Sequence, residues 1–347
     1  MSRLRAGILG ATGLVGQQFA RIISTHPAFE LTGLYASTGS TGRKYSDSIK
    51  HMATELKEEV LDMKVASVDS ISDMIHEVDV IFSSLPANMG DLERSISRSL
   101  PVITKSSAHR MDENVPLIIP EINPDHLALI DHQRRGGSVG FISADPNCST
   151  TQLVLTLKPL ERFGIEWVNV STMQALSGAG YPGVSSMDMI GNIVPHIDQE
   201  EEKMESEPLK ILGSLWENKS LRTATLNILA SCNRVPVVDG HMETVFVKLR
   251  SDPDISEVAR AMREFRGSEA SRNLPSSPER VLVLTDEEGR PQPRLDLMNG
   301  GGMSVTVGKL RKSGDIISFT SLSHNTIRGA AGGGVLHAEL LKSKGYI

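Results

Sequence analysis

The sequence predicts an α/β protein of two domains, the first built on a parallel sheet and the second an α+β domain with a mostly antiparallel sheet. Its 347 residues are too many for one simple core. The first half alternates short apolar strands with helices, which is typical of a doubly wound sheet. The second half has longer strands without regular intervening helices. We place the first domain at 1–147 and the second at 148–324, and expect 325–347 to pack back on the first.

Composition and charge describe a folded protein and exclude several classes. Hydrophobic residues make up 39% of the chain, charged residues 22%, and the net charge is −6. This balance carries no basic signature for nucleic acid or an anionic membrane. No apolar run approaches the roughly 18 residues that cross a bilayer, and glycines interrupt the apolar N-terminal stretch, so we expect neither a membrane span nor a signal peptide. With only two cysteines, Cys148 and Cys232, we expect no disulfide framework and a reducing, cytoplasmic setting.

The first strand, 4–9, leads through a glycine-rich turn, 10–16, into a helix at 17–24. Strand, glycine turn and helix in this order are the context of a Rossmann-type dinucleotide-binding domain. There the glycines let the backbone approach a pyrophosphate at the helix N-terminus. The spacing is GxxGxxG rather than the commoner GxGxxG. The alternative is a plain strand-to-helix turn.

The end of the second strand, 29–35, distinguishes the two nicotinamide cofactors. An NAD enzyme usually carries Asp or Glu at this point. Here Ser37 and Thr38 follow the strand, with the cations Arg43 and Lys44 further on. These groups suit a 2′-phosphate, so we expect NADP; the alternative is a polar loop with solvated charges.

Further strands of the first sheet are expected at 78–86, 101–105 and 140–143. In doubly wound sheets the carboxyl ends of the strands face the ligand crevice. This places Ser84 at the crevice, together with the segment that follows 140–143.

That segment, 145–151, holds Cys148 just before an apolar helix. The helical spacing is carried by Leu153, Val154, Leu157 and Leu160. We expect Ser149, Thr150 or Thr151 to cap the helix. Unpaired N–H groups and the positive end of a helix dipole lower a thiol pKa and can later stabilise an oxyanion, so Cys148 is a candidate nucleophile. The alternative is a small buried hydrophobe.

In the second half, strands are expected at 167–175 and 242–250, and a hairpin at 303–310 and 315–322 with its turn at 311–314. One face of such a sheet needs covering, and a partner subunit is a common solution.

The segment 325–342 is expected to be a helix, although it contains Gly329 and three consecutive glycines at 332–334. Glycines permit the close approach of another backbone.

Several polar groups of the chain are candidates for substrate chemistry. Gln174, in a glycine-rich loop, can orient a substrate or a water, or serve as loop scaffolding. Arg234 can clamp a carboxylate in two parallel hydrogen bonds, and His241 can be the base that a thiol needs, or a structural histidine. The charge run at 200–203 is a further candidate, and the alternative is a solvated helix face. The segment 105–111 offers cations that could bind an anion, and the alternative is a polar loop. No metal-ligand spacing occurs, so we expect no metal.

Five motifs, in their order and spacing, resemble the aspartate-semialdehyde dehydrogenase family in its archaeal and fungal type, over essentially the whole chain. They are GATGLVG at 10–16, PNCST at 146–150, QALSGAGYPG at 174–183, RVPVVDGH at 234–241 and NTIRGAA at 325–331. The resemblance implies a two-domain fold, NADP(H) as the cofactor, and a homodimer or homotetramer.

By position, the resemblance makes Cys148 the nucleophile, His241 the acid/base and Gln174 the residue that orients the acyl intermediate. The implied reaction is the reversible reductive dephosphorylation of L-aspartyl 4-phosphate to L-aspartate 4-semialdehyde, with release of inorganic phosphate. It belongs to the biosynthesis of lysine, threonine, methionine and isoleucine. The thiolate attacks the acyl carbon, hydride reduces the thioester, and a base of near-neutral pKa serves both directions.

The resemblance also implies binding positions. Arg234 clamps the substrate α-carboxylate, while Glu200 and Lys203 receive the amino group and the phosphate. Further phosphate-site groups are Arg110 and Asn147. The implied cofactor positions are Gly10, Thr12, Gly13, Leu14, Val15, Gly16, Ser37, Thr38, Arg43, Ser84, Leu85, Pro86, Ser177, Gly178, Asn325 and Thr326.

Two rival enzymes are malonyl-CoA reductase, which would share the cysteine, the histidine and the glycine loops, and N-acetyl-glutamyl-phosphate reductase. Glu200 and Lys203 argue against malonyl-CoA, which has no amino group or free phosphate to bind. A rival of another class is a non-enzymatic NADP-binding regulatory protein. Such a protein does not need the set formed by Cys148, His241, Gln174 and Arg234.

Overall fold

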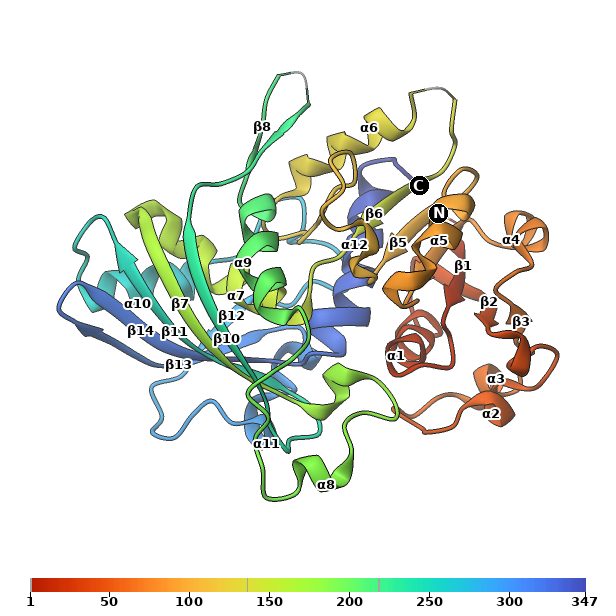
Figure 1. Cartoon of the computed structure of the whole chain (residues 1–347). Helices are drawn as coiled ribbons and strands as arrows, with labels where there is room; N and C mark the ends of the chain where they lie inside the picture. Colours follow the sequence, from red (N-terminus) through yellow and green to blue (C-terminus); the bar gives the residue numbers. More distant parts are fainter. Residues whose placement is uncertain (1, 136, 218) are drawn as a thin grey trace.

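The computed structural model describes residues 2–135, 137–217 and 219–347. They form two six-stranded sheets and a two-stranded ribbon. The first sheet belongs to the N-terminal part, red to orange-yellow in Figure 1, and the second to the green-to-blue part. None of the helices described is long and apolar enough to cross a membrane.

The first sheet is wholly parallel, in the order β3-β2-β1-β4-β5-β6. Its strands are β1 Leu4–Leu9, β2 Phe29–Ala36, β3 Ala66–Ser67, β4 Val80–Ser83, β5 Pro101–Thr104 and β6 Phe141–Ala144. The helices of this part are α1 Leu14–Ile23, α2 Tyr45–Ser48, α3 Glu58–Leu61, α4 Ile71–Glu77, α5 Gly90–Ile96 and α6 Ile130–Gln133. The strand order reverses between β1 and β4, which confirms the Rossmann-type fold and puts a ligand crevice at the carboxyl ends of these two strands.

The second sheet has the order β10-β7-β11-β14-β13-β12. Its strands are β7 Ile165–Gln174, β10 Asn227–Arg234, β11 His241–Leu249, β12 Leu282–Leu284, β13 Val305–Ser313 and β14 Ile316–Ser323, and the ribbon is β8 Ser214–Leu215 with β9 Leu221–Arg222. The helices are α7 Cys148–Leu157, α8 Ser186–Met189, α9 Glu200–Ile211, α10 Ile255–Glu264, α11 Pro293–Asp296 and α12 Gly332–Ser343.

This second sheet is mixed, with three antiparallel pairings at its centre. Its outer strands β10 and β12 run parallel to β7 and β13. Sequence analysis missed β10. This strand lies at an edge, where Asn227, Leu229 and Ser231 are exposed, so it lacks the alternation of apolar and polar residues that marks a half-buried strand.

Three predicted boundaries differ from the structure. The first helix begins at Leu14 rather than at 17, because the glycine turn is already helical in its second half. The hairpin reverses at Gly314, whose φ of +60° suits a tight turn, so the expected turn at 311–314 is mostly strand. The last helix is preceded by a π-helical turn, Ile327–Ala331.

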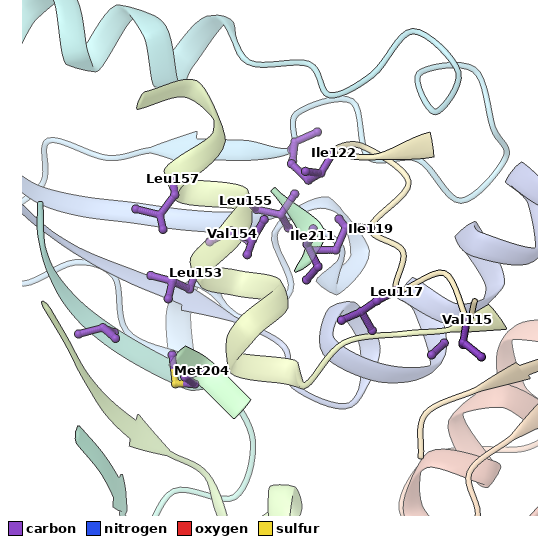
Figure 2. Close-up of a cluster of buried hydrophobic side chains, with 14 of the residues drawn as sticks. Val115, Leu117, Ile119, Ile122, Leu153, Val154, Leu155, Leu157, Met204 and Ile211 are labelled. Atoms are coloured by element: carbon purple, nitrogen blue, oxygen red, sulfur yellow. The ribbon is translucent and has the colours of Figure 1, made fainter. Parts of the chain in front are cut away.

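Helix α7 is buried on all sides rather than on one face. In Figure 2, Leu153 and Leu157 point to one side of the helix, and Leu155 points to the other side, toward Ile211 and Ile119. These residues belong to one hydrophobic cluster that also includes the second sheet. The cysteine at the start of α7 is therefore held by a rigid core.

The C-terminal helix α12, blue in Figure 1, lies against the first sheet. Val335 and Leu341 share a hydrophobic cluster with Phe19 and Phe82 of that sheet and its helix α1. A Cβ at Gly334 would come within 2.9 Å of the Phe19 ring. The expected return of the last segment to the N-terminal part is thus present as a close packing contact.

One face of the second sheet is left half-exposed. Along β7 and β11, residues such as Val168 and Val245 are buried, whereas Trp167, Met242 and Phe246 on the alternate face are partly exposed. The half-exposed apolar face is the one that sequence analysis expected to need a cover.

Candidate functional site

The cysteine lies where segments of both parts of the chain meet: Gly329 packs on Cys148, and Glu200 joins Asn147 to Gln174. Gly178 shows how closely its loop packs against Arg234 and His241. A Cβ at Gly178 would lie 2.8 Å from Nη1 of Arg234 and 3.0 Å from Nε2 of His241. A Cβ at Gly329 would lie 2.4 Å from Cβ of Cys148, so the C-terminal segment touches the nucleophile position, as the glycine there predicted.

The N-cap of the cysteine helix is Asn147, not one of the three hydroxyl residues that follow. Its Oδ1 accepts hydrogen bonds from the N–H groups of Ser149 (2.8 Å) and Thr150 (3.1 Å). The helix begins at Cys148, so Ser149, Thr150 and Thr151 already lie in its first turn. The cap also occupies two N–H groups that were expected to be free for an oxyanion. That part of the prediction is wrong.

The thiol is not activated by the helix start alone. Burial, and after it the charge of Glu200, raises the pKa of Cys148 to about 12. Arg110, Lys105 and the N–H of Ser149 act in the opposite direction but do not balance the burial. The expected low thiol pKa is therefore wrong for the free protein, because removing charge from water outweighs the dipole.

His241 is a neutral ring in a fixed tautomer. Its Nδ1 accepts a hydrogen bond from the N–H of Ala175 at 3.1 Å, so the ring proton resides on Nε2. Nε2 is buried, and no partner for it occurs among the residues described. Burial lowers the pKa of His241 to about 3, with smaller contributions from Arg234 and His324. The ring is therefore a neutral hydrogen-bond donor in the free protein, and the acid/base role expected of His241 stays a prediction.

Of the three consecutive glutamates at 200–202, Glu200 is the one that contacts the residues beside the cysteine. Its Oε1 accepts hydrogen bonds from Nδ2 of Asn147 and Nε2 of Gln174, both at 2.9 Å. Lys203 lies 3.8 Å from its other oxygen. Glu201 instead binds the backbone of Cys232. The interpretation of 200–203 as a solvated face is thus wrong for Glu200, which is buried.

The two arginines are buried and partly engaged. Arg234 donates from Nη1 to the carbonyl of Ala175 at 2.7 Å. Arg110 donates to Oε1 of Glu207 (2.8 Å) and to the carbonyl of Lys105 (2.6 Å), while its Nε finds no partner among the residues described.

Sequence analysis missed two residues that hold this site together. Oε2 of Glu207 accepts from the backbone N–H of Asn147 at 2.7 Å, so Glu207 joins Arg110 to the start of the cysteine helix. Lys210 donates to the carbonyls of Arg110, Asp112 and Val115 at 2.7 to 2.8 Å. A signal was available, because Glu200, Lys203, Glu207 and Lys210 fall at helical spacing on one face of α9.

The glycine turn has the shape that a dinucleotide requires. Gly10 has φ +74°, and a Cβ at Gly16 would lie 2.3 Å from the Gly10 carbonyl oxygen. A Cβ at Gly13 would meet only that carbonyl, at 3.4 Å, so its outer side is open to a ligand. Ser84 donates to the carbonyls of Leu9 and Gly10, which fixes β4 to the turn.

A cavity of about 400 Å³ lies next to this turn. Its walls are formed by Thr12, Gly13, Leu14, Gln17, Ser37, Ser40, Ser48, Lys50, His51, Tyr181 and Pro182. The predicted Thr38 and Arg43 lie on the exposed loop and do not line it. Lys50 and His51 line it instead, and sequence analysis missed them. The His51 ring stacks on Tyr181 with centroids 5.5 Å apart.

Other predicted cofactor positions lie at the boundary of the two parts. Asn325 donates to Oγ of Ser177 at 2.7 Å and accepts from the N–H of Gly240 at 2.9 Å. Thr326 and Leu85 are buried, Val15 is half-buried and Pro86 is exposed. No cluster of three or more metal-ligating side chains occurs in the described ranges.

Comparisons with known proteins agree over the whole chain. Residues 5–130 match the family model described as semialdehyde dehydrogenase, NAD binding domain, and residues 157–328 match its dimerisation domain. An aspartate-semialdehyde dehydrogenase of Methanothermobacter thermautotrophicus is 47% identical over 97% of this chain and 99% of its own. The crystal structure of aspartate semialdehyde dehydrogenase with NADP from Candida albicans is similar at a TM-score of 0.90 and 39% identity, covering 100% of both chains.

A malonyl CoA reductase (NADP) of Metallosphaera sedula is also similar, with 39% identity over 99% of this chain and 98% of its own. The archaeal aspartate-semialdehyde dehydrogenase is closer in sequence. The chain belongs to the aspartate-semialdehyde dehydrogenase family.

Proposed function

We propose that the protein catalyses the reversible, NADP-dependent conversion of L-aspartyl 4-phosphate to L-aspartate 4-semialdehyde and phosphate, through a thioester on Cys148. One observation carries the proposal: the opposite charges Glu200 and Arg234 both adjoin Gln174, and Glu200 also accepts a hydrogen bond from Asn147 at the start of the cysteine helix. An amino acid offers the complementary ammonium and carboxylate, and a guanidinium can hold the carboxylate in two parallel hydrogen bonds.

In the acylation step, Sγ of Cys148 bonds to the acyl carbon, the bond from that carbon to the phosphate oxygen breaks, and phosphate leaves. Gln174, held by Glu200, orients the acyl group. Arg110, Lys203 and Asn147 bind the phosphate. NADPH, when bound, supplies the hydride that reduces the thioester.

In this mechanism His241 keeps its proton on Nε2 and donates a hydrogen bond to the acyl oxygen. Asn147 takes up two N–H groups of the helix, and the unpaired Nε2–H of His241 is a donor that supports the negative charge on that oxygen. A bound anionic substrate raises the pKa of the ring and offsets the effect of Arg234, so the same nitrogen can exchange a proton with the hemithioacetal. We assign His241 this acid/base role.

The cofactor is assigned to the glycine turn and the cavity beside it. The open side of Gly13 suits a pyrophosphate, and Ser37, Ser40 and Lys50 suit a 2′-phosphate. Ser177, Gly178 and Asn325 are placed toward the nicotinamide end, near the cysteine. Thr38 and Arg43 stay candidate contacts on the outer loop.

One assay separates this function from malonyl-CoA reduction, which the Metallosphaera relative performs by its name. The protein is given aspartate semialdehyde, phosphate and NADP, and in a parallel reaction malonyl-CoA and NADPH, while the absorbance of the reduced cofactor is followed. We expect turnover in the first reaction. Turnover with malonyl-CoA alone would reject the proposal, and cofactor binding without turnover of either would favour a regulatory protein.

The chain has the family's dimerisation domain. We propose a homodimer through the half-exposed face of the second sheet, with a homotetramer as the larger alternative. The NADP-binding domain is assigned to 1–147 with 325–347, and the catalytic and dimerisation domain to 148–324, following the two sheets. A cytoplasmic location is proposed because a thiol nucleophile needs a reducing compartment.

A further inference from the structure

Glu243 is a carboxyl group enclosed in the core behind the catalytic site. It lies on β11, two residues after His241, and its exposed fraction is 0%. Its Oε1 has no hydrogen-bond partner among the residues described, and no cation of those residues forms an ion pair with it. Burying an ionised carboxylate without a cation is costly, so the neutral form of the group is favoured.

A single hydroxyl connects Glu243 to the cysteine helix. Oγ of Ser321, on β14, donates to Oε2 of Glu243 in a long hydrogen bond of 3.5 Å. The same Oγ accepts a hydrogen bond from Nε2 of Gln152, in α7, at 2.9 Å. Oε1 of Gln152 is buried and has no partner in the described part of the chain. The three side chains thus form a buried network that leaves one oxygen unpartnered at either end.

This network lacks a proton if Glu243 is ionised. A carboxylate and the oxygen of an amide only accept hydrogen bonds. Ionised Glu243 would therefore leave two buried acceptors without donors, its own Oε1 and that of Gln152. A protonated carboxyl brings the missing donor, and Oε1 of Gln152, on the other side of Ser321, is the acceptor open to it.

The titratable groups that face Glu243 give its charge no support. Burial raises the pKa of Glu243 well above its ordinary value; Ser321 acts in the opposite direction, and the negative charge of Glu200 on α9 adds to the rise. Cys232, on β10, is a neutral thiol, because burial raises its pKa to about 12. His241, on the same strand, is a neutral ring.

The network also joins the elements that carry the two catalytic groups. Gln152 lies four residues after Cys148, on the same face of α7. Glu243 lies two residues after His241, on the same buried face of β11. Ser321 is the residue of β14 that pairs with Glu243. A hydrogen bond between Glu243 and Gln152 therefore fixes the cysteine helix against the histidine strand.

We propose that Glu243 is a protonated, neutral carboxyl and a positioning residue of the reaction: its O–H donates to Oε1 of Gln152 and sets the cysteine helix against the strand of His241. The catalytic part of this proposal rests on the function proposed above. The protonation of Glu243 does not, because it follows from the buried network alone.

Thermal unfolding from pH 5 to 8 tests the protonation in wild type and Glu243→Gln. The amide has the shape of the protonated carboxyl and can also donate to Gln152. An unfolded glutamate ionises above about pH 4.3, so a folded state that keeps the proton binds one proton more than the unfolded state. The wild type then loses about tenfold in its folding equilibrium per pH unit, a loss that Glu243→Gln does not share. We expect the Tm of Glu243→Gln, relative to wild type, to rise steadily over this range.

Infrared spectroscopy detects the same proton directly. At pH 8 the wild type is expected to show the C=O band of a protonated carboxyl, and Glu243→Gln is expected to lack it. Glu166→Gln is the matched control, because Glu166 is an exposed glutamate of the neighbouring strand β7. It should keep both the band and the wild-type dependence of Tm on pH.

Steady-state kinetics test the positioning role. Glu243→Leu can neither donate nor accept a hydrogen bond, and we expect it to lower kcat about tenfold while KM for the semialdehyde changes less than about threefold. Glu243→Gln should restore kcat to within about twofold of wild type, since its amide can still donate. NADPH binding by fluorescence reports whether Glu243→Leu is folded, and Glu243→Met replaces it if it is not.

A constant difference in Tm between wild type and Glu243→Gln from pH 5 to 8, or the absence of the protonated-carboxyl band, overturns the proposal. Wild-type kcat in a folded Glu243→Leu also overturns it and makes Glu243 a residue of the core only. Unfolding and infrared measurements need no substrate. A wild type without the proposed activity would therefore reject that function and the positioning role, while the protonation of Glu243 is decided independently.

Discussion

At His241 a single backbone hydrogen bond determines what the ring can do. The N–H of Ala175 occupies Nδ1 and leaves the proton on Nε2, which is buried without a partner in the part of the chain described. Asn147 has a similar effect beside the cysteine, where its Oδ1 takes up two helix N–H groups. Sequence analysis selected the residues that meet here, but protonation and donor availability depend on such neighbours.

Replacing Cys148 by Ser is expected to abolish turnover, at least a thousandfold, because a hydroxyl of much higher pKa is a poor nucleophile at the same place. Absorbance of the reduced cofactor measures the turnover, and fluorescence measures NADPH binding, which we expect to change less than threefold. Cys232→Ser is the control and should stay active, since Cys232 is buried in the core. Loss of cofactor binding in Cys148→Ser would mean that the residue is structural.

Arg234→Lys is expected to raise KM for the semialdehyde at least tenfold, with a smaller change in kcat. An ammonium cannot reproduce the two parallel hydrogen bonds of a guanidinium on a carboxylate. Steady-state kinetics at saturating NADP and phosphate give both constants. A KM within twofold of wild type would contradict the clamp role.

At the scale of elements, α9 organises the site. Its inward face carries Glu200, Glu207 and Lys210, which contact the N-cap, Arg110 and the loop behind Arg110. The opposite face carries Glu202, which is exposed. One helix thus fixes the substrate groups relative to the nucleophile.

Lys210→Met is expected to raise KM for phosphate about tenfold and KM for the semialdehyde much less. Lys210 ties down three carbonyls of the loop that carries Arg110, and without them this loop is free to move. Glu202→Gln on the exposed face of the same helix is the matched control and should leave both constants unchanged. Equal increases in the two KM values would argue for a general loss of folding, which thermal unfolding would also report.

The sequence predicted the elements that have a strong local signal. Sequence analysis expected the glycine turn and the hairpin of β13 and β14 close to where they lie. It also expected five of the six strands of the parallel sheet, namely β1, β2, β4, β5 and β6. The cap Asn147 was missed although its hydrogen bonds to Ser149 and Thr150 are local, because the hydroxyl residues after Cys148 are also of types that cap helices. The edge strand β10 was missed because its pairing partner β7 is distant in the chain. Glu207 was missed for the same reason, as its partners come from two other segments.

At the scale of the whole molecule, the second sheet is covered on one face only. Phe246 and Trp167 lie on its half-exposed face, while Val245 and Val168 point into the core. A face of this kind suits a symmetric contact with a second copy.

Phe246→Asp is expected to convert the dimer into a monomer at micromolar concentration, because it puts a charge on an apolar face that dimerisation would bury. Light scattering coupled to size-exclusion chromatography measures the mass. Val139→Asp, which changes an exposed residue of the first part, is the control and should stay dimeric. A dimer that persists in Phe246→Asp would place the contact on another surface.

The contact between Gly329 and Cys148 also bears on how the protein is made. Phe19 and Phe82, from the first quarter of the chain, are covered by α12, and the cysteine is supported by the turn just before that helix. During synthesis the N-terminal part emerges first, yet its apolar surface stays open until residues up to Leu341 follow. Until that helix and the turn before it have been made, the nascent chain exposes this apolar surface, and the cysteine lacks the segment that packs against it.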